Sequence, residues 1–436
     1  MSGGNSDADG QRGDAMKLAA LVFTVAALSA QSVSTTRPVL SEQLAHESTD
    51  DRIKACEKLL AASPKDMRLQ IELITAYLQK LRETADFAYL DRASKLVDGM
   101  LEADGGNLVA LRFENEIDMQ RHDFKSVADR AQDILKYAPS DAGSWANLGD
   151  AEMELGDYER AGAAYRRMFA LRPGLTSYNR FAWYRFVTGD QQSAIALMLQ
   201  AVDAGDPAPE NIAWCLAELG DMYFKTGRVA DAGATYTTAL QNFATLHRAW
   251  AGLGRVHAEQ GRTQDAIHDY LRAQAIVPLP DYAGALEDLY NASGQAAKAK
   301  EQHELIGTIE KLGQATKEKV NRNLALLLAD HDRDLNVAMT LIETELPTRG
   351  DVYTWDAYSW ILFKSGRLDE ARAASAKALR MATPEPLFYF HAAKIAKAAG
   401  DEKSAQAYQA RLTALNAKFD FGKTELARAE QRGGAQ

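Results

Sequence analysis

The stretch WANLGDAEMELGDYERAGAAYRRMFALRP, residues 145–173, contains the pattern that decides the fold. Apolar residues recur there at helical spacing in two runs. Gly156 stands between the runs, because glycine tolerates the left-handed conformation that ends a helix. Ala161 follows five residues later, where two helices approach too closely for a larger side chain. Pro173 ends the second run because proline has no amide hydrogen. The stretch therefore predicts two helices joined by a tight turn.

The same step from glycine to alanine returns along most of the chain. Eight alanines follow one another at intervals of 33 to 39 residues, and a glycine stands five residues before each of them except at Arg333. These alanines are Ala161, Ala194, Ala232, Ala266, Ala299, Ala338, Ala371 and Ala405. Eight steps at nearly one period indicate tandem repeats.

A second set of markers surrounds each step. Trp250, Leu253 and Gly254 open one period, and Ala266 with Tyr270 marks its second helix. This order of W-x2-L-G-x2-Y, then A-x3-F, then P resembles the tetratricopeptide repeat, whose period is about 34 residues. The resemblance covers about residues 50–418. It implies an all-α solenoid, a right-handed superhelix of about nine antiparallel helix pairs that stabilise one another by stacking.

The repeats divide the chain into predicted segments. Residues 49–310 form an N-terminal array, and residues 311–418 form a C-terminal array that begins with an irregular repeat. Residues 1–30 are a signal peptide region, 31–48 a polar leader, and 419–436 a cap followed by a polar tail. The irregular repeat, residues 319–334, lacks the turn glycine and the leading aromatic residue. The sequence leaves open whether the irregular repeat is a hinge or an ion site, and the lengthened connection before it, residues 307–319, is either a longer helix or a hinge.

Composition and motifs exclude several classes of protein. The 436 residues carry a net charge of -10, which argues against a general affinity for nucleic-acid phosphates. Two cysteines are too few for a scaffold held together by disulfides. The chain has no phosphate-binding loop, no hydrolase nucleophile elbow and no H-E-x-x-H zinc helix. We therefore expect no enzyme, no catalytic residues and no cofactor.

The run from Asp330 to Asp334 is the best candidate for a metal site. Its carboxylates and His331 are ligands that divalent ions accept. The run coincides with the turn between two helices, where aspartates normally cap the second helix. We therefore assign no metal.

By resemblance, the first helix of each pair lines a concave groove. The side chains left over from helix packing on this face are aromatic and charged, which suits an extended peptide or a helix. They are Asn179, Trp183, Phe186, Trp214, Asp221, Phe224, Lys225, Arg248, Arg255 and Trp360. The alternative is that these rings fill a tight superhelix and touch only each other. Asn147 and Asn179 lack the lysine partners that clamp a C-terminal carboxylate in related proteins, so that class of partner is not implied.

These observations predict a scaffold that binds a protein or peptide and has no catalytic activity. We expect a protein or peptide partner and no nucleic-acid partner. After removal of the signal we expect no integral membrane span in the chain, and self-association into a homo-oligomer is compatible with the sequence. An alternative is a structural component that self-associates or joins envelope complexes.

Residues 18–30, LAALVFTVAALSA, predict export. These thirteen, almost wholly apolar residues are too few to span a bilayer, which takes about 20, but they match the apolar region of a secretory signal. Ala27 and Ser29 are suitable small residues for cleavage, and cleavage after Ala30 is an equal alternative. Met16, followed by Lys17, makes a better start than Met1 because residues 1–15 are acidic. The expected location is the periplasm or the exterior of a bacterium, or the cytoplasm if this segment is no signal.

The mass of the mature protein tests export. In a Gram-negative host we expect the intact mass of the purified protein to correspond to a chain that begins at Ala30 or Gln31. A purified protein that retains residues 18–30 would instead favour a cytoplasmic role.

Overall fold

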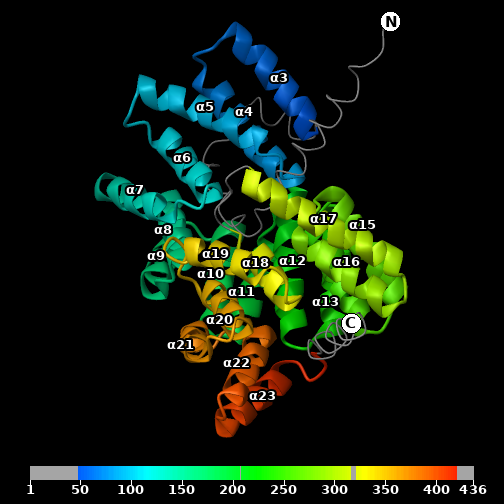
Figure 1. The fold of residues 1–436 in the computed structure, drawn as a ribbon. Coiled ribbons are helices and arrows are strands. Elements are labelled where there is room, and N and C mark those ends of the chain that lie inside the picture. The colour runs from blue at the N-terminus through cyan, green and yellow to red at the C-terminus, as the bar shows by residue number, and fades with distance from the viewer. Residues whose placement is uncertain (1–47, 207, 316–320, 420–436) are drawn as a thin grey trace, which may run out of the picture.

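The computed structural model describes residues 48–206, 208–315 and 321–419, and within these residues it contains helices and no strands (Figure 1). In chain order they are α3 (Thr49–Ala62), α4 (Met67–Thr84), α5 (Ala88–Ala103), α6 (Leu108–Gln120), α7 (Phe124–Tyr137), α8 (Ala142–Leu155), α9 (Tyr158–Leu171), α10 (Leu175–Val187), α11 (Gln191–Ala204), α12 (Pro209–Lys225), α13 (Val229–Asn242), α14 (His247–Glu259), α15 (Thr263–Ile276), α16 (Pro280–Ala292), α17 (Ala296–Ala315), α18 (Arg322–Asp330), α19 (Leu335–Glu345), α20 (Val352–Lys364), α21 (Leu368–Ala378), a 3-10 helix (Leu379–Met381), α22 (Pro386–Ala398) and α23 (Glu402–Leu415). None of the described helices is both long and apolar enough to cross a membrane.

The helices are organised as consecutive pairs. From α4 to α23 each first helix packs along the second helix that follows it, and each pair packs on the next, with α3 as a lone helix at the N-terminal end. Figure 1 shows the chain passing from α3 at the top to α23 at the bottom. The predicted all-α solenoid is confirmed.

The turns between paired helices follow the predicted step. The seven step glycines have φ between 73° and 87°, and all eight step alanines are buried. At Arg333, where glycine is missing, Asp332 and Asp334 take positive φ values of 49° and 38° instead. Two aspartates therefore make the turn of the irregular repeat, and aspartate tolerates this conformation better than most residues do.

A glycine on the first helix of a pair makes room for a tyrosine from the second helix. A Cβ atom at Gly220 would lie 2.6 Å from the ring of Tyr236, and one at Gly254 would lie 2.7 Å from the ring of Tyr270. No methyl group fits at such distances, so the tyrosine ring of the second helix packs directly against the backbone of the first helix. The tyrosine also gains a polar contact, since the Oη of Tyr236 donates a hydrogen bond to Asp221 at 2.6 Å.

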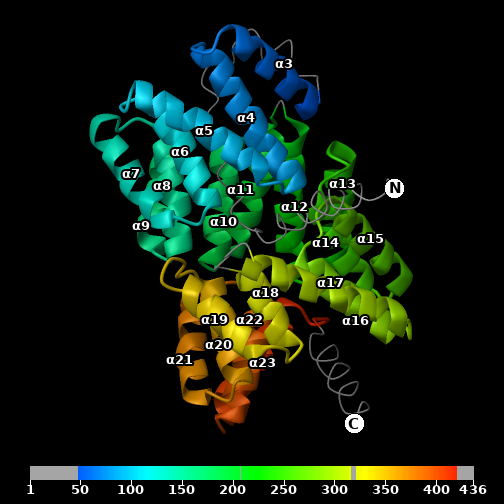
Figure 2. The ribbon, with the colours of Figure 1, turned by 45° about the horizontal axis from the view of Figure 1, so that its top comes forward.

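The C-terminal repeats return to the middle of the chain. The turn between α8 and α9 meets the segment before α20, where Arg349 Nε donates to Glu154 at 2.6 Å. The turn between α10 and α11 meets the connection after the 3-10 helix, where Thr383 Oγ1 donates to the carbonyl of Val187 at 2.6 Å. In Figure 2 helices α18–α23 accordingly lie beneath α8–α12. Repeats in a solenoid normally contact only their neighbours, so these contacts close the superhelix on itself.

The predicted boundary between two arrays needs a correction. A boundary after residue 310 falls inside α17, which continues to Ala315. Ala283 of α16 and Ile306 of α17 also share one hydrophobic cluster with Leu324 of α18 and with residues of α19, α20, α22 and α23, so packing continues across the boundary. The hinge stays a prediction because residues 316–320 lie outside the described residues. The signal region and nearly all of the leader and the polar tail also lie outside them.

The glycine–tyrosine contact generates a stability prediction. We expect Gly220→Ala to lower the free energy of unfolding by about 1–3 kcal/mol, because the added methyl group collides with the ring of Tyr236. Gly99→Ala is the matched control, since a Cβ there has no atom within 4 Å and alanine favours the helix by up to about 1 kcal/mol. Urea unfolding followed by circular dichroism measures both. Equal midpoints for the two variants would show that the contact does not set the helix spacing.

Candidate functional site

The closed superhelix surrounds a cavity of about 360 Å³, lined mainly by first helices, from α4 to α20. Six of the ten predicted groove residues line it: Trp183, Trp214, Asp221, Lys225, Arg248 and Arg255. Side chains from α18 and α20, among them Arg322 and Tyr353, complete the wall. The C-terminal repeats therefore help to enclose the site, which the sequence periodicity could not indicate.

Three predicted groove residues are buried in the helix packing, so their assignment to an open groove is wrong. Phe186 and Trp360 are 0% exposed, and Asn179 is 5% exposed. The amide Nδ2 of Asn179 lies 3.2 Å from Cys215 Sγ, and Trp360 stacks on His391 with ring centroids 4.1 Å apart. These side chains stabilise the repeats and do not line the cavity.

Arginines and rings from successive first helices form one wall of the cavity. The guanidinium of Arg248 lies 4.2 Å from the ring centre of Trp214, and that of Arg255 lies 5.5 Å from the ring centre of Phe224, which is itself partly buried against the core. Both arginines donate to Asp221, at 2.9 Å from Arg248. Burial alone would raise the pKa of Asp221, but Arg255 and Arg248 hold it at about 2. The wall is therefore fixed by its own ion pairs and cation–π contacts.

Lys225 closes one end of the cavity. Its Nζ lies 2.8 Å from Glu385 and within 6 Å of the ring centres of Trp183, Phe186 and Tyr353. Trp183 and Tyr353 are stacked, with ring centroids 6.0 Å apart. Burial would lower the pKa of Lys225, but Glu385 raises it above its ordinary value. At this end of the cavity the rings of Trp183 and Tyr353 contact one another, which is the alternative arrangement considered for the groove, in which the rings fill a tight superhelix.

Charge is balanced around the cavity except at Asp281. The lining cations and their carboxylate partners are Arg82 with Glu210, Lys225 with Glu385, Arg248 with Glu218 and Asp221, Arg255 with Asp221, and Arg322 with Asp351. Within the described part of the chain, Asp281 forms no ion pair and accepts one hydrogen bond, from Asn323 Nδ2 at 3.1 Å. Desolvation inside the superhelix raises the pKa of Asp281 to about 6, although Arg322 and Arg255 act in the opposite direction without forming an ion pair with it. Asp281 is not among the predicted groove residues, and the signal for it in the sequence is its place after Pro280 at the start of a first helix.

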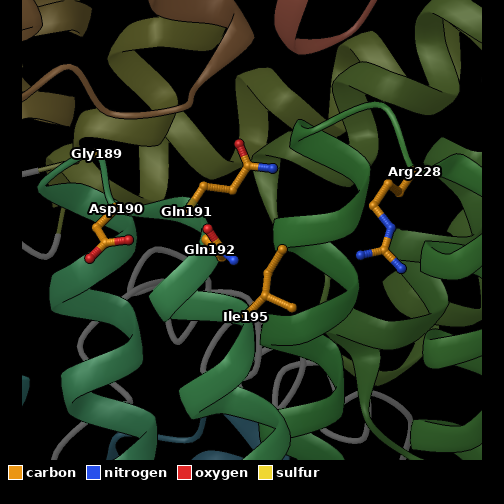
Figure 3. A pocket seen from close by; sticks show the side chains of 6 residues that line it. All are labelled: Gly189, Asp190, Gln191, Gln192, Ile195 and Arg228. Carbon is orange, nitrogen blue, oxygen red and sulfur yellow. The ribbon is translucent and has the colours of Figure 1, made fainter.

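A second depression lies at the start of α11 and is also lined by Arg228, which precedes α13 (Figure 3). Its charged side chains already have partners. Asp190 caps α11 by accepting from the Ser193 amide at 3.1 Å, and Arg228 donates to Asp231 at 2.7 Å. This depression therefore presents no unbalanced charge to a ligand.

The side chains of the metal candidate are engaged by neighbouring helices. Asp330 accepts from the Nε1 of Trp360 at 2.9 Å, and Lys364 lies 3.1 Å from Asp332. His331 Nε2 lies 3.3 Å from Asp288. In the described ranges, no three histidine, cysteine or acidic side chains come together as a metal site. These contacts give the run a structural role in the irregular repeat.

The family model that matches two parts of the chain agrees with the repeat architecture. Residues 119–175 and 217–280 match the family model described as tetratricopeptide repeat. A structure of the human IFIT1 dimer with PPP-AAAA is 12% identical over 92% of this chain and 94% of that chain, with a TM-score of 0.47. PilW, a widely conserved type IV pilus biogenesis factor, is 20% identical over 47% of this chain and 91% of its own, with a TM-score of 0.39. MamA is 18% identical over 37% of this chain and 92% of its own, with a TM-score of 0.31. No curated protein matches the chain.

Glu116 of α6 lies close to Arg82 of the cavity wall and is 3% exposed. Burial raises its pKa to about 7, although Arg82 and Arg180 act in the opposite direction. The pKa of Glu116 in the folded state lies above its ordinary value of 4.5. The free energy of unfolding therefore falls as the pH rises from about 4.5 to about 7, because ionising this buried carboxyl destabilises the folded state.

Replacing Glu116 by glutamine tests this burial. We expect Glu116→Gln to be more stable than the wild type at pH 8 by about 1–3 kcal/mol, and the difference to shrink at pH 5, where the wild-type carboxyl is protonated. Urea unfolding of both proteins at the two pH values measures it. A difference that is the same at pH 5 and pH 8 would contradict the raised pKa.

Proposed function

We propose that this chain, two parts of which match the tetratricopeptide repeat model, binds a segment of a protein or peptide partner in the cavity inside its superhelix. One observation carries the proposal: six side chains of the predicted binding face line one enclosed cavity of about 360 Å³. Tetratricopeptide repeats form scaffolds for protein–protein interaction, and aromatic side chains beside arginines are the residues that most often dominate such contacts. The proposed role involves no catalysis.

The wall of the cavity is already ordered. Arg248 rests on Trp214 and is held by Glu218 at 2.5 Å, while Asp221 joins Arg248 to Arg255. A partner therefore does not need to order these side chains, and ordering costs about 0.5–1.5 kcal/mol for each flexible side chain. Pre-organisation of this kind favours selective binding of a short segment.

The volume of the cavity limits the size of the partner. A cavity of about 360 Å³ lies at the small end of the range for ligand pockets, which is about 300–1,000 Å³. It therefore suits a short segment of a partner rather than a folded domain.

We place this activity in the periplasm or outside the cell, on the strength of the apolar stretch at residues 18–30. The alternative function is an assembly component that self-associates or joins envelope complexes. Association that depends on protein concentration, in the absence of any bound peptide, would favour this alternative.

Blocking the cavity tests the proposal. Thr245 is exposed, lines the cavity and lies in the turn between α13 and α14. We expect Thr245→Trp to bring an indole to the cavity wall and to weaken peptide binding at least tenfold. The probe is an array of terminally blocked hexapeptides of varied sequence, followed by calorimetric titration of the best binder.

Thr237→Trp is the matched control, because Thr237 is exposed on α13 and does not line the cavity. This variant should bind like the wild type, and both variants should keep the helical content and melting behaviour of the wild type. Undiminished binding by Thr245→Trp would move the site away from the cavity.

A further inference from the structure

Asp281 gives the cavity an unbalanced negative charge. Each of the five cations that line the cavity has a carboxylate within 4.0 Å. Each carboxylate that lines the cavity, except Asp281, likewise has a cation within 4.0 Å. For Glu83 this cation is Lys80, at 3.7 Å. The charge that remains to be neutralised inside the cavity is therefore one carboxylate. A ligand that carries a cation supplies what the wall itself does not.

The position of Asp281 keeps it accessible. It is an exposed residue in the first turn of α16, although the superhelix surrounds it. The amide of Asn323 occupies its Oδ2 at 3.1 Å, and no described residue bonds its Oδ1. An accessible carboxylate oxygen can accept a charge-assisted hydrogen bond, which is stronger than one between neutral groups.

Two tyrosine rings line the cavity beside this carboxylate. Tyr282 follows Asp281 in the chain, and Tyr270 projects from α15 with its ring centre 6.3 Å from that of Tyr282. Tyr282 is held in place by His247, whose Nδ1 lies 2.7 Å from its Oη. Ring faces attract cations, and the apolar stem of a lysine or arginine packs well on aromatic rings.

We infer that Asp281 selects the partner: the cavity takes an extended peptide segment with a lysine or arginine side chain, whose charged end pairs with the Asp281 carboxylate. This inference rests on the proposed function and adds the chemistry of the segment that binds. Net charge favours the same partner, since the protein carries -10 overall and attracts basic segments over a longer range.

Asp281→Asn is the test, because asparagine keeps the shape of the side chain and can still accept from Asn323. The probe is the same array of blocked hexapeptides. We expect peptides bound by the wild type to be enriched in lysine and arginine, and this enrichment to disappear in Asp281→Asn while peptides without basic residues still bind. For the best lysine-containing peptide, we expect replacement of lysine by norleucine to weaken binding to the wild type roughly tenfold and to change binding to Asp281→Asn less than twofold.

Asp265→Asn is the matched control. Asp265 is on the surface of α15, where it pairs with Arg262, and it does not line the cavity. The substitution changes the net charge of the protein by the same amount and should leave the preference for basic peptides intact. A preference lost equally in both variants would overturn the inference, because overall charge would then be its cause.

The other outcomes separate the inference from the proposed function. Peptide binding that Thr245→Trp abolishes, but that shows no basic preference or keeps it in Asp281→Asn, would overturn the role of Asp281 and leave the cavity as the binding site. An array on which the wild type binds no peptide would overturn both.

Discussion

The contact between a first-helix glycine and a second-helix tyrosine is the constraint on which the rest of the structure depends. It brings the helices of a pair together at Gly220 and Gly254, and it places the hydroxyl of Tyr236 beside Asp221. The same arrangement holds Tyr165 beside Asp150, where the almost fully buried Arg180 completes the network at 2.9 Å. Helix packing and the polar wall of the cavity are therefore consequences of one close approach.

The closure of the superhelix gives the protein an interior that a short array would lack. Three successive turns of the middle repeats meet the segments that follow α19, the 3-10 helix and α23, through Arg349, Thr383 and Asn416. Much of the concave face is thereby covered by the chain itself, and a cavity of about 360 Å³ remains. The face that the repeat period predicts to be a long groove is therefore reduced to a short cavity, which suits the short segment that we propose as its ligand. The balance of charges around it then makes Asp281 the natural position for selectivity.

Part of the site could be foreseen, since the repeat period identifies which face of each first helix turns inward. It correctly brings Trp214, Asp221 and Arg248 to the cavity. It fails for Phe186 and Trp360, which are 0% exposed, because periodicity gives the direction of a side chain and not how deeply its neighbours cover it. Asp281 was missed for the opposite reason: its importance lies in a missing counter-ion, and pairing between distant side chains leaves no local pattern.

The sequence alone determined the helix pairs, their turns and their stacking order, because these depend on contacts within one repeat or between neighbours. Even the turn without glycine could be located at Arg333, and only the conformation of Asp332 and Asp334 was new. The tertiary structure decided that Trp183 meets Tyr353 and that Val352 hydrogen-bonds to Tyr158, 194 residues away in the chain. Small rotations between successive repeats accumulate along a solenoid, and their sum decides whether the superhelix closes. No single repeat encodes that sum, so closure and the cavity that it creates are visible only in three dimensions.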